Sequence, residues 1–320
     1  MGQYDIRPLT PDDIPAIMAL QLENQRLHPQ AEVVSGETYL SPGFGRGNNV
    51  ICAFDERGRL AGYIPVYPHV GLEGNAPQII WANMLVRKDA EDPASLRDLL
   101  FGHGMEKAKE LAMVNPGRAT RMMFQYHPSE AESIAYVLST GAQHVDSAMR
   151  MARPLDGEIP IPRAPRNIEV RLWEMESEME QQAYVRAREE AFPQASIGLS
   201  EWQYFLETMK TDGGTTVAAF DGLEVVGAVS AYWYDAENRL RGKASGWTEN
   251  IFVRPRWIGR GIASSIISRA LVFLKDNRLL EAQLDVSASN KRAVGVYERL
   301  GYKTVDESRQ YAVDIQTSAH

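Results

Sequence analysis

The 320-residue sequence has a single cysteine, Cys52, and only six histidines. One cysteine excludes an internal disulfide and is typical of a reducing compartment, so we expect a cytoplasmic protein. The histidines show no paired metal-ligand spacing, which argues against a metal site. No apolar run approaches the roughly 18–20 residues that span a bilayer, so we expect no membrane association.

An excess of basic residues is also missing. Lys and Arg number 34 against 42 Asp and Glu, giving a formal net charge of −8, which disfavours nucleic acid as a partner. Neither half of the chain contains G-x-S-x-G, which argues against a serine hydrolase. The length predicts two domains, each large enough to bury its own core.

A proline-rich stretch marks the boundary between them. Residues 153–166 contain four prolines, which exclude a helix and favour an extended, semi-rigid connector. We therefore predict a first domain over 1–152, a linker over 153–166 and a second domain over 167–320.

The same order of elements is predicted on both sides of this boundary: strand, helix, hairpin, strand, helix, strand, helix, strand. In the first half the elements are expected at 4–9, 12–27, 49–54, 60–67, 78–86, 95–114, 121–125, 129–139 and 145–152. In the second half, where two helices follow the first strand, they are expected at 168–173, 177–191, 200–209, 215–220, 225–234, 247–253, 262–276, 281–286, 290–300 and 302–315. The repeat indicates two tandem α/β domains of one fold.

The most informative segment joins the strand ending at residue 253 to the helix that follows. It places Gly259, Gly261, Arg256 and Arg260 at a helix start. A helix N-terminus exposes unpaired backbone N–H groups and binds phosphate readily, and glycine lets the backbone approach a bulky anion. The segment is neither a P-loop nor a G-x-G-x-x-G dinucleotide motif.

A second segment follows about thirty residues later. It reads Asn290-x-x-Ala293-x-x-x-Tyr297-x-x-x-Gly301-Tyr302, after the earlier Arg256-x-x-Gly259-x-Gly261-Ile262-Ala263. Together the two segments resemble the GNAT superfamily of acyl-CoA-dependent N-acyltransferases, over roughly residues 166–315. The resemblance implies an α/β (α+β) fold of two tandem GNAT-like domains, each a mixed, mostly antiparallel twisted sheet flanked by helices.

The resemblance also implies acetyl-CoA as co-substrate, with no metal. In the family, the turn before the helix holds the CoA pyrophosphate, and the backbone of the preceding strand pairs with the pantetheine arm. The cofactor-binding residues expected here are Ile251, Phe252, Val253, Arg256, Ile258, Gly259, Arg260, Gly261, Ile262, Ala263 and Asn290. For either arginine the alternative is a surface charge. Asn290 is expected to cap its helix first, with a bond to the cofactor as a second role.

Two side chains are candidates for catalysis. Strand alternation places Glu249 on one face with Trp247, Ile251 and Val253, where burial would raise the pKa of its carboxyl group and suit a general base. The alternative is a sheet-edge or salt-bridged glutamate. Tyr297 matches the family's general acid, which protonates the leaving thiolate, although its helix spacing also fits a plain core tyrosine.

The first half lacks the corresponding groups. Alignment of residue 86 with residue 253 places Asp89, Glu91 and Asp92 where the second half has its anion-binding turn. Carboxylates would repel a pyrophosphate. Alignment of the helix that follows places Val137 at the position of Tyr297 and Glu130 at that of Asn290. We therefore expect a degenerate N-terminal copy and one active copy.

The resemblance implies an N-acetyltransferase that moves an acetyl group from acetyl-CoA to a primary amine by direct attack in a ternary complex. The acceptor is expected to be a small-molecule or peptide amine, and the protein a monomer or homodimer. Asp285 and Ser287 either line the acceptor pocket or stabilise it. Two alternatives stay open: a non-catalytic acyl-CoA-binding or sensing protein, and a mycothiol-synthase-like tandem acetyltransferase.

Overall fold

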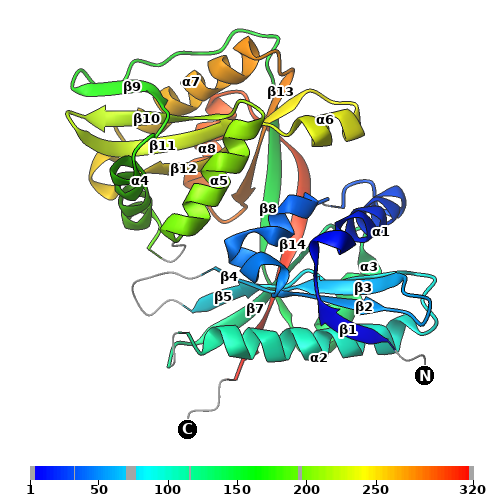
Figure 1. The fold of residues 1–320 in the computed structure, drawn as a ribbon. Coiled ribbons are helices and arrows are strands. Elements are labelled where there is room, and N and C mark those ends of the chain that lie inside the picture. The colour runs from blue at the N-terminus through cyan, green and yellow to red at the C-terminus, as the bar shows by residue number, and fades with distance from the viewer. Residues whose placement is uncertain (1–3, 32, 70–76, 115–116, 194–196, 317–320) are drawn as a thin grey trace. The chain divides into compact units, whose positions relative to one another are not determined.

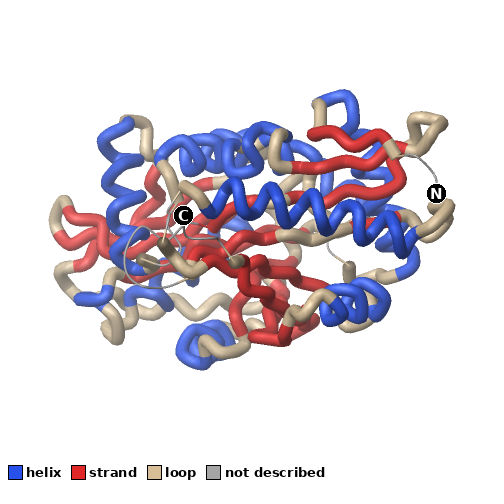
Figure 2. Tube along the Cα trace, turned by 90° about the horizontal axis from the view of Figure 1, so that it is seen from below, coloured by secondary structure: helices blue, strands red, loops and turns tan. Residues whose placement is uncertain are grey.

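The computed structural model describes residues 4–31, 33–69, 77–114, 117–193 and 197–316. They form two compact units, Met1–Asp146 together with Ser308–His320, and Ser147–Glu307. Both units combine helices with strands, as Figure 1 shows by label and Figure 2 by colour. The described residues 308–316 thus belong to the first unit and 147–152 to the second, whereas the predicted boundaries placed them the other way round.

The first unit contains two groups of strands. One is an antiparallel sheet in the order β1-β2-β3-β6, and the other has the order β4-β5-β7-β14. Their bounds are β1 Asp5–Pro8, β2 Val50–Phe54, β3 Leu60–Pro65, β4 Tyr67–His69, β5 Gln78–Trp81, β6 Leu85–Val86, β7 Thr120–Tyr126 and β14 Lys303–Ile315. The strand predicted over 78–86 is thus two strands, because residues 82–84 leave the pairing with β7 before β6 pairs with β3.

Helices of the first unit pack on these strands. They are α1 Ile14–Leu27, α2 Pro93–Ala112 and α3 Ala131–Ser139, with short 3-10 turns at Pro11–Asp13, Gly36–Leu40 and Pro42–Gly47. The buried side of α2, including Leu96 and Leu100, packs with Ile51 and Ile64 of the sheet in one apolar core. Burial of these side chains is the main stabilising contribution.

The second unit has one continuous sheet in the order β8-β13-β12-β11-β10-β9. Its strands are β8 Gln143–Pro154, β9 Ile168–Trp173, β10 Thr215–Asp221, β11 Glu224–Tyr232, β12 Ser245–Val253 and β13 Glu281–Ser287. Neighbouring strands run antiparallel except for β12 and β13, which are parallel. The mixed, mostly antiparallel sheet expected from the sequence is confirmed.

Helices cover both faces of this sheet (Figure 1). They are α4 Glu178–Ala191, α5 Leu199–Thr211, α6 Asp235–Arg241, α7 Ile262–Asp276 and α8 Lys291–Arg299, with a 3-10 turn at Pro255–Trp257. One core joins α7 to the sheet through residues such as Ile266 and Leu271, and the other contains Tyr184 of α4 and Trp202 of α5. Helix α6 was not anticipated, because no element was predicted between 225–234 and 247–253.

The proline-rich segment is packed rather than free. Leu155 and Ile159 are buried in the core of the second unit, and Ser265 Oγ of α7 donates to the carbonyl oxygen of Pro162 at 3.1 Å. The segment contains no helix, as its prolines predict. It therefore follows the surface of the second unit and contributes to its core.

Candidate active site

The site begins where two parallel strands separate. β12 pairs with β13 only over Ser245–Trp247 and Glu281–Gln283. Beyond this point β12 stays bonded to β11, and β13 stays bonded to β8 along its whole length. The divergence leaves one edge of β12 without a strand partner, beside a cavity of about 880 Å³.

Side chains from five elements and the intervening turns line this cavity. The lining residues are Arg188, Ala191, Phe192, Thr248, Glu249, Asn250, Ile251, Phe252, Val253, Trp257, Ile258, Gly259, Gly261, Ile262, Ala263, Ser264, Ile267, Asp285, Val286, Ser287, Asn290, Arg292, Ala293, Val296, Tyr297 and Arg299. All belong to the second unit. The cavity brings together most of the site residues expected from the sequence.

A β-bulge interrupts β12 inside the cavity. Phe252 pairs with Ala228 of β11, but the next pair is Glu249 with Ser230, so β12 carries one extra residue there. Asn250 adopts a left-handed backbone with φ of 50° at this point. Asparagine tolerates that conformation better than most residues, and a bulge increases the local twist of the strand.

The bulge reverses the side-chain alternation. Trp247 and Phe252 both pack on the core that contains helices α4 and α5, whereas Ile251 and Val253 pack on the core beneath α7. The expectation that Trp247, Glu249, Ile251 and Val253 share one face is therefore wrong. A strict period of two fails because one residue is inserted between the two halves of the strand.

The backbone of β12 presents a donor toward the divergence. The N–H of Arg254 donates to the carbonyl oxygen of Val226 at 2.9 Å. Because successive N–H groups along a strand point to opposite sides, the N–H of Val253 points away from β11. This is the side on which β13 has diverged.

The turn before α7 requires its glycines. Gly259 and Gly261 have φ values of 84° and 82°, a region that residues with a Cβ rarely adopt. The first backbone bond into the helix runs from Ser265 N to Gly261 O. Among the described residues, the amides of Ile262, Ala263 and Ser264 have no acceptor, as helix geometry dictates for a first turn.

The arginines around this turn are distributed differently from the expectation. Arg256 and Arg260 are exposed and do not line the cavity, and the guanidinium of Arg256 lies 5.4 Å from the ring centroid of Trp257. Arg292 of α8 does line it, and its Nη2 lies 3.8 Å from the point that a Cβ on Gly259 would occupy. Arg292 was not among the expected site residues, although its place two residues after the cap Asn290 was a usable signal.

Glu249 lies half-buried at the cavity. Its Oε2 accepts a hydrogen bond of 2.6 Å from the hydroxyl of Tyr232. Tyr232 stands near the end of β11, within the core formed with α4 and α5. The carboxylate is thus oriented by a neighbouring strand of the same sheet.

Tyr297 of α8 also lines the cavity, and it belongs to the core that contains α7. The residue is 8% exposed, and burial raises the pKa of its phenol to about 12. Its ring makes an edge contact with Tyr302 at 6.1 Å between centroids. A phenol with a raised pKa stays protonated at neutral pH, so Tyr297 is a proton donor there.

Asn290 caps helix α8, as expected. Its Oδ1 accepts from the N–H of Ala293 at 3.1 Å. The residue also lines the cavity. Asn290 therefore satisfies one helix amide while lining the same cavity as the glycine turn before α7.

Polar side chains of β13 form another wall. Asp285 accepts two hydrogen bonds from Arg150 of β8, at 2.9 and 2.8 Å. The guanidinium of Arg150 lies 4.9 Å from the ring centroid of Trp247. The hydroxyl of Ser287 lies 2.7 Å from that of Ser289. Asp285 and Ser287 therefore line the cavity and are also hydrogen-bonded to neighbouring side chains.

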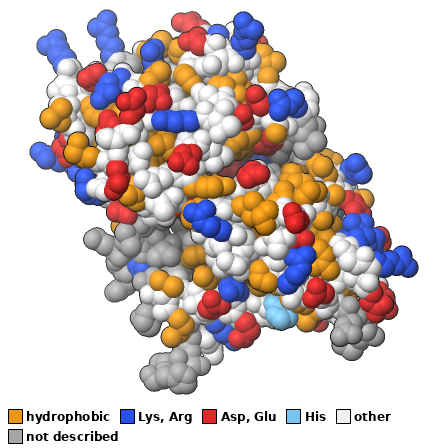
Figure 3. All heavy atoms as spheres, in the orientation of Figure 1, with side chains coloured by type: hydrophobic (Ala, Val, Ile, Leu, Met, Phe, Trp, Pro, Cys, Tyr) orange, Lys and Arg blue, Asp and Glu red, His pale blue; other side chains and the backbone are white. Residues whose placement is uncertain are grey.

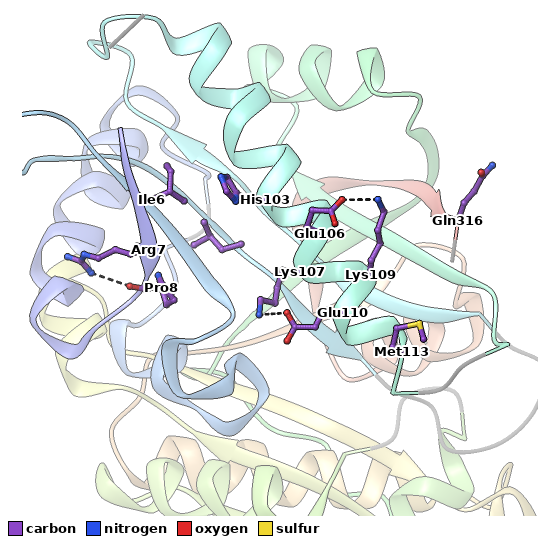
Figure 4. Close-up of a pocket in the computed structure, with 11 residues that line it drawn as sticks. Ile6, Arg7, Pro8, His103, Glu106, Lys107, Lys109, Glu110, Met113 and Gln316 are labelled. Atoms are coloured by element: carbon purple, nitrogen blue, oxygen red, sulfur yellow. Dashed lines mark hydrogen bonds and ion pairs between the residues drawn. The ribbon is translucent and has the colours of Figure 1, made fainter. Parts of the chain in front are cut away.

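The first unit has a groove of about 690 Å³ between β1 and α2 (Figure 4). Its charged side chains are satisfied by one another: Lys107 pairs with Glu110 and Lys109 with Glu106. Arg7 pairs with Asp13. A groove whose charges are already paired gives no indication of a ligand.

Acidic and basic side chains are interspersed on the face shown in Figure 3. Within the described ranges, no cluster of three or more His, Cys, Asp or Glu side chains has a geometry that could hold a metal ion. None of the helices in that part of the chain is long and apolar enough to cross a membrane.

Comparison with known proteins agrees with this geometry. Residues 172–302 match the acetyltransferase (GNAT) family, a range that contains the diverging strands, the glycine turn and helix α8. The second unit therefore contains a domain that matches the acetyltransferase (GNAT) family. The matched range includes Glu249, Tyr297 and the α7 turn.

Two curated relatives align along nearly the whole of this chain. Mycothiol acetyltransferase of Actinosynnema mirum is 26% identical over 314 residues, 96% of each chain. Mycothiol acetyltransferase of Streptomyces coelicolor is 27% identical over 311 residues, 96% of this chain and 93% of the relative. The similarity therefore extends over both units.

Solved structures show the same tandem fold. A GCN5-related N-acetyltransferase from Sphaerobacter thermophilus has a TM-score of 0.73 at 20% identity, with 99% of this chain and 97% of that chain covered. A tandem GNAT protein from the clavulanic acid biosynthesis pathway has a TM-score of 0.69 at 13% identity, with 99% and 100% covered. The tandem arrangement expected from the internal repeat is confirmed.

Proposed function

We propose that the second unit transfers an acetyl group from acetyl-CoA to the primary amine of a small molecule. The observation that carries this proposal is the meeting of three features at one cavity: a free edge of β12, the open first turn of α7, and the pair Glu249 and Tyr297. A binding site alone requires the first two features. A carboxylate and a phenol at the same cavity supply a proton acceptor and a proton donor as well.

The first turn of α7 would hold the pyrophosphate of the co-substrate. The amides of Ile262, Ala263 and Ser264 face the turn, and the helix dipole favours an anion there. Arg292 adds a cation beside Gly259. The residues present thus fit a diphosphate, with the adjoining pantetheine arm along the free edge of β12.

Proton transfer would be divided between two residues. Glu249 accepts the proton that the amine loses as its nitrogen attacks the thioester carbonyl carbon. The N–H of Val253 stabilises the negative charge that develops on the carbonyl oxygen. As the C–S bond breaks, Tyr297 donates its proton to the sulfur, so that the products are an amide and the free thiol of CoA. The tyrosinate and the protonated carboxyl then exchange protons with solvent.

The acceptor class is suggested by the relatives. Both curated relatives are mycothiol acetyltransferases and align across both units. Arg188, Asp285 and Ser287 give the cavity wall polar groups that suit an acceptor with several polar substituents. We therefore propose a small-molecule amine related to the desacetyl form of mycothiol, and this compound is the first acceptor to test.

The test is release of CoA thiol in the presence of acetyl-CoA and a panel of amines that includes desacetyl mycothiol. We expect release to require both substrates. Glu249→Gln should lower kcat at least 100-fold with little change in acetyl-CoA binding, because a general base contributes about 10²–10⁴-fold.

Glu207→Gln, a change at an exposed position on α5, is the matched control and should retain full turnover. Tight acetyl-CoA binding by calorimetry with no thiol release from any amine would instead identify a binding protein. Unchanged turnover in Glu249→Gln would remove this residue from the mechanism.

A further inference from the structure

Tyr232 reaches Glu249 across two neighbouring strands. In the register of β11 and β12, Tyr232 lies opposite Trp247, and Glu249 lies opposite Ser230. The tyrosine and the glutamate are therefore diagonal neighbours, a separation that an aromatic side chain can span. The result is the 2.6 Å hydrogen bond from the Tyr232 hydroxyl to Glu249 Oε2.

The ring of Tyr232 is fixed in place. The residue is 4% exposed, and its ring makes edge contacts with Phe205 at 5.4 Å and with Tyr234 at 5.3 Å between centroids. Such packing leaves the ring little freedom to rotate away from the carboxylate. The hydroxyl is thus held as a donor to Glu249.

We propose that Tyr232 is a positioning residue that orients Glu249 at the cavity and sets the lowest pH at which this carboxylate works as a base. The proposal rests on the proposed function, in which Glu249 accepts the proton of the amine. A hydrogen bond to the ionised carboxylate stabilises the charged form, so the bond keeps Glu249 ionised at lower pH. It also reduces the rotamer freedom of the glutamate before the substrate arrives.

Tyr232 remains a donor throughout the working pH range. Burial first, and then the negative charge of Glu249, raise the pKa of Tyr232 well above its ordinary value. The phenol therefore does not ionise where the enzyme would be assayed. No tyrosine titrates in the acid range, and protonation of the acceptor amine is common to wild type and variant, so a difference between their acid limbs does not come from either.

Other titratable or charged groups surround the pair. The cavity that contains Glu249 is also lined by Arg188 on α4, Asp285 on β13, and Arg292, Tyr297 and Arg299 on α8. The groups near the Tyr232 hydroxyl are Tyr234, which follows β11, and Glu237 on α6. Arg150 is bonded to Asp285. These groups are present in the wild type and in a Tyr232 variant alike, so a difference between the two profiles reports the hydrogen bond.

The test is the pH profile of kcat/KM for Tyr232→Phe, measured with the same acceptor as the wild type. Removal of a hydrogen bond to a charged group should move the acid limb to higher pH by about one to two units. Below the wild-type limb the variant should be about 10- to 100-fold slower, and the two rates should converge toward high pH. The KM for acetyl-CoA should stay the same.

Tyr126→Phe in the first unit is the matched control. Tyr126 is also a buried tyrosine with a bonded hydroxyl, but its partner is the backbone of Met84. This variant should keep the wild-type acid limb. If both substitutions disturbed the folded structure, the unfolding midpoints of both variants would fall. Titration with acetyl-CoA checks that the binding site of each variant is intact.

Glu249→Gln separates failure of this inference from failure of the proposed function. If Glu249→Gln abolishes turnover while Tyr232→Phe keeps the wild-type acid limb, the role of Tyr232 is refuted and the base assignment stands. If Glu249→Gln turns over normally, the base assignment itself fails, and the inference fails with it. A limb shifted to higher pH in Tyr232→Phe alone supports both.

Discussion

The two units differ at the point where two parallel strands stop pairing; these strands are β12 and β13 in the second unit and β5 and β7 in the first. In the second unit β12 leaves β13 after three residue pairs, and a cavity lies at the divergence. In the first unit β5 and β7 are paired over four residues. Where this pairing ends, side chains hydrogen-bond backbone groups of the two segments that follow. Asn83 Oδ1 accepts from Gln125 N at 2.8 Å, and the hydroxyl of Tyr126 bonds both N and O of Met84 at 3.0 and 3.2 Å. Side chains of the first unit thus satisfy backbone groups of the kind that, in the proposed function, the second unit would offer to the co-substrate.

The helix that follows shows the same contrast. Helix α2 begins at a carboxylate, because Asp92 accepts from the N–H and the hydroxyl of Ser95 at 3.1 and 2.6 Å. Helix α7 begins at Gly261 with no side-chain cap. Val137, aligned with Tyr297, is fully buried. The first unit therefore carries its own anion at the position where the second would bind a phosphate, which supports a single acyl-CoA site per chain.

The largest effect is expected when the first turn of α7 is given a carboxylate, as the start of α2 already has in Asp92. Ser264 lies in the first turn of α7 and lines the cavity. Ser264→Asp should lower the affinity for acetyl-CoA about 1,000-fold, since one unit charge at about 4 Å from a phosphate costs about 4 kcal/mol at an effective dielectric of 20. Calorimetric titration with acetyl-CoA measures the effect.

Ser264→Asn is the control, because it has nearly the same shape without the charge. Its affinity should fall far less. The aspartate variant should be at least as stable as the wild type, because an acidic residue in a first helical turn interacts favourably with the dipole. Retained acetyl-CoA binding in Ser264→Asp would show that the anion site lies elsewhere.

The second unit also differs from the first in having Tyr297, the proposed proton donor, where the first has Val137. Tyr297→Phe should lower kcat about 100-fold while leaving acetyl-CoA affinity nearly intact, because the ring still fills the core and only the proton at the sulfur is lost. The raised pKa of about 12 predicts that the wild-type phenol stays protonated well above neutral pH. Steady-state kinetics with saturating acceptor measures kcat.

Tyr302→Phe tests whether any buried hydroxyl in this core has the same effect. The hydroxyl of Tyr302 lies 2.7 Å from Thr248 Oγ1, and the residue does not line the cavity. Its loss should reduce stability more than turnover. Equal falls in kcat for the two variants would mean that Tyr297 acts through packing, not as an acid.

The sequence allowed prediction of the parts of the site that depend on local pattern. The glycines at 259 and 261 and the cap at Asn290 are properties of short segments, and they lie at the cavity as expected. The face of Glu249 and its bond to Tyr232 could not be predicted, because both depend on strand register and on the bulge at Asn250.

The same limit applies to the division of the chain. The repeat predicted two similar halves, but β14 starts in the second unit and ends in the first. Its residues 309–315 pair with β7, a long-range choice that no local pattern encodes. The place of Arg292 two residues after the cap is visible in the sequence, but its distance from Gly259 depends on how α8 packs beside the turn before α7.

The smallest expected effect concerns the hydrogen bonds between the Tyr126 hydroxyl and the backbone of Met84, where the pairing of β5 with β7 ends. Tyr126→Phe should reduce the free energy of unfolding by about 1–3 kcal/mol, because the buried N–H of Met84 loses its acceptor. Tyr136→Phe, whose hydroxyl bonds Asp98 at an exposed position, is the control and should change stability much less. Chemical denaturation measures both variants. Acetyl-CoA titration of Tyr126→Phe should still show one equivalent per chain, because Asp92 continues to cap α2 and Val137 still fills the position of the acid. A second equivalent would mean that the hydroxyl of Tyr126 alone had closed the first unit to the ligand.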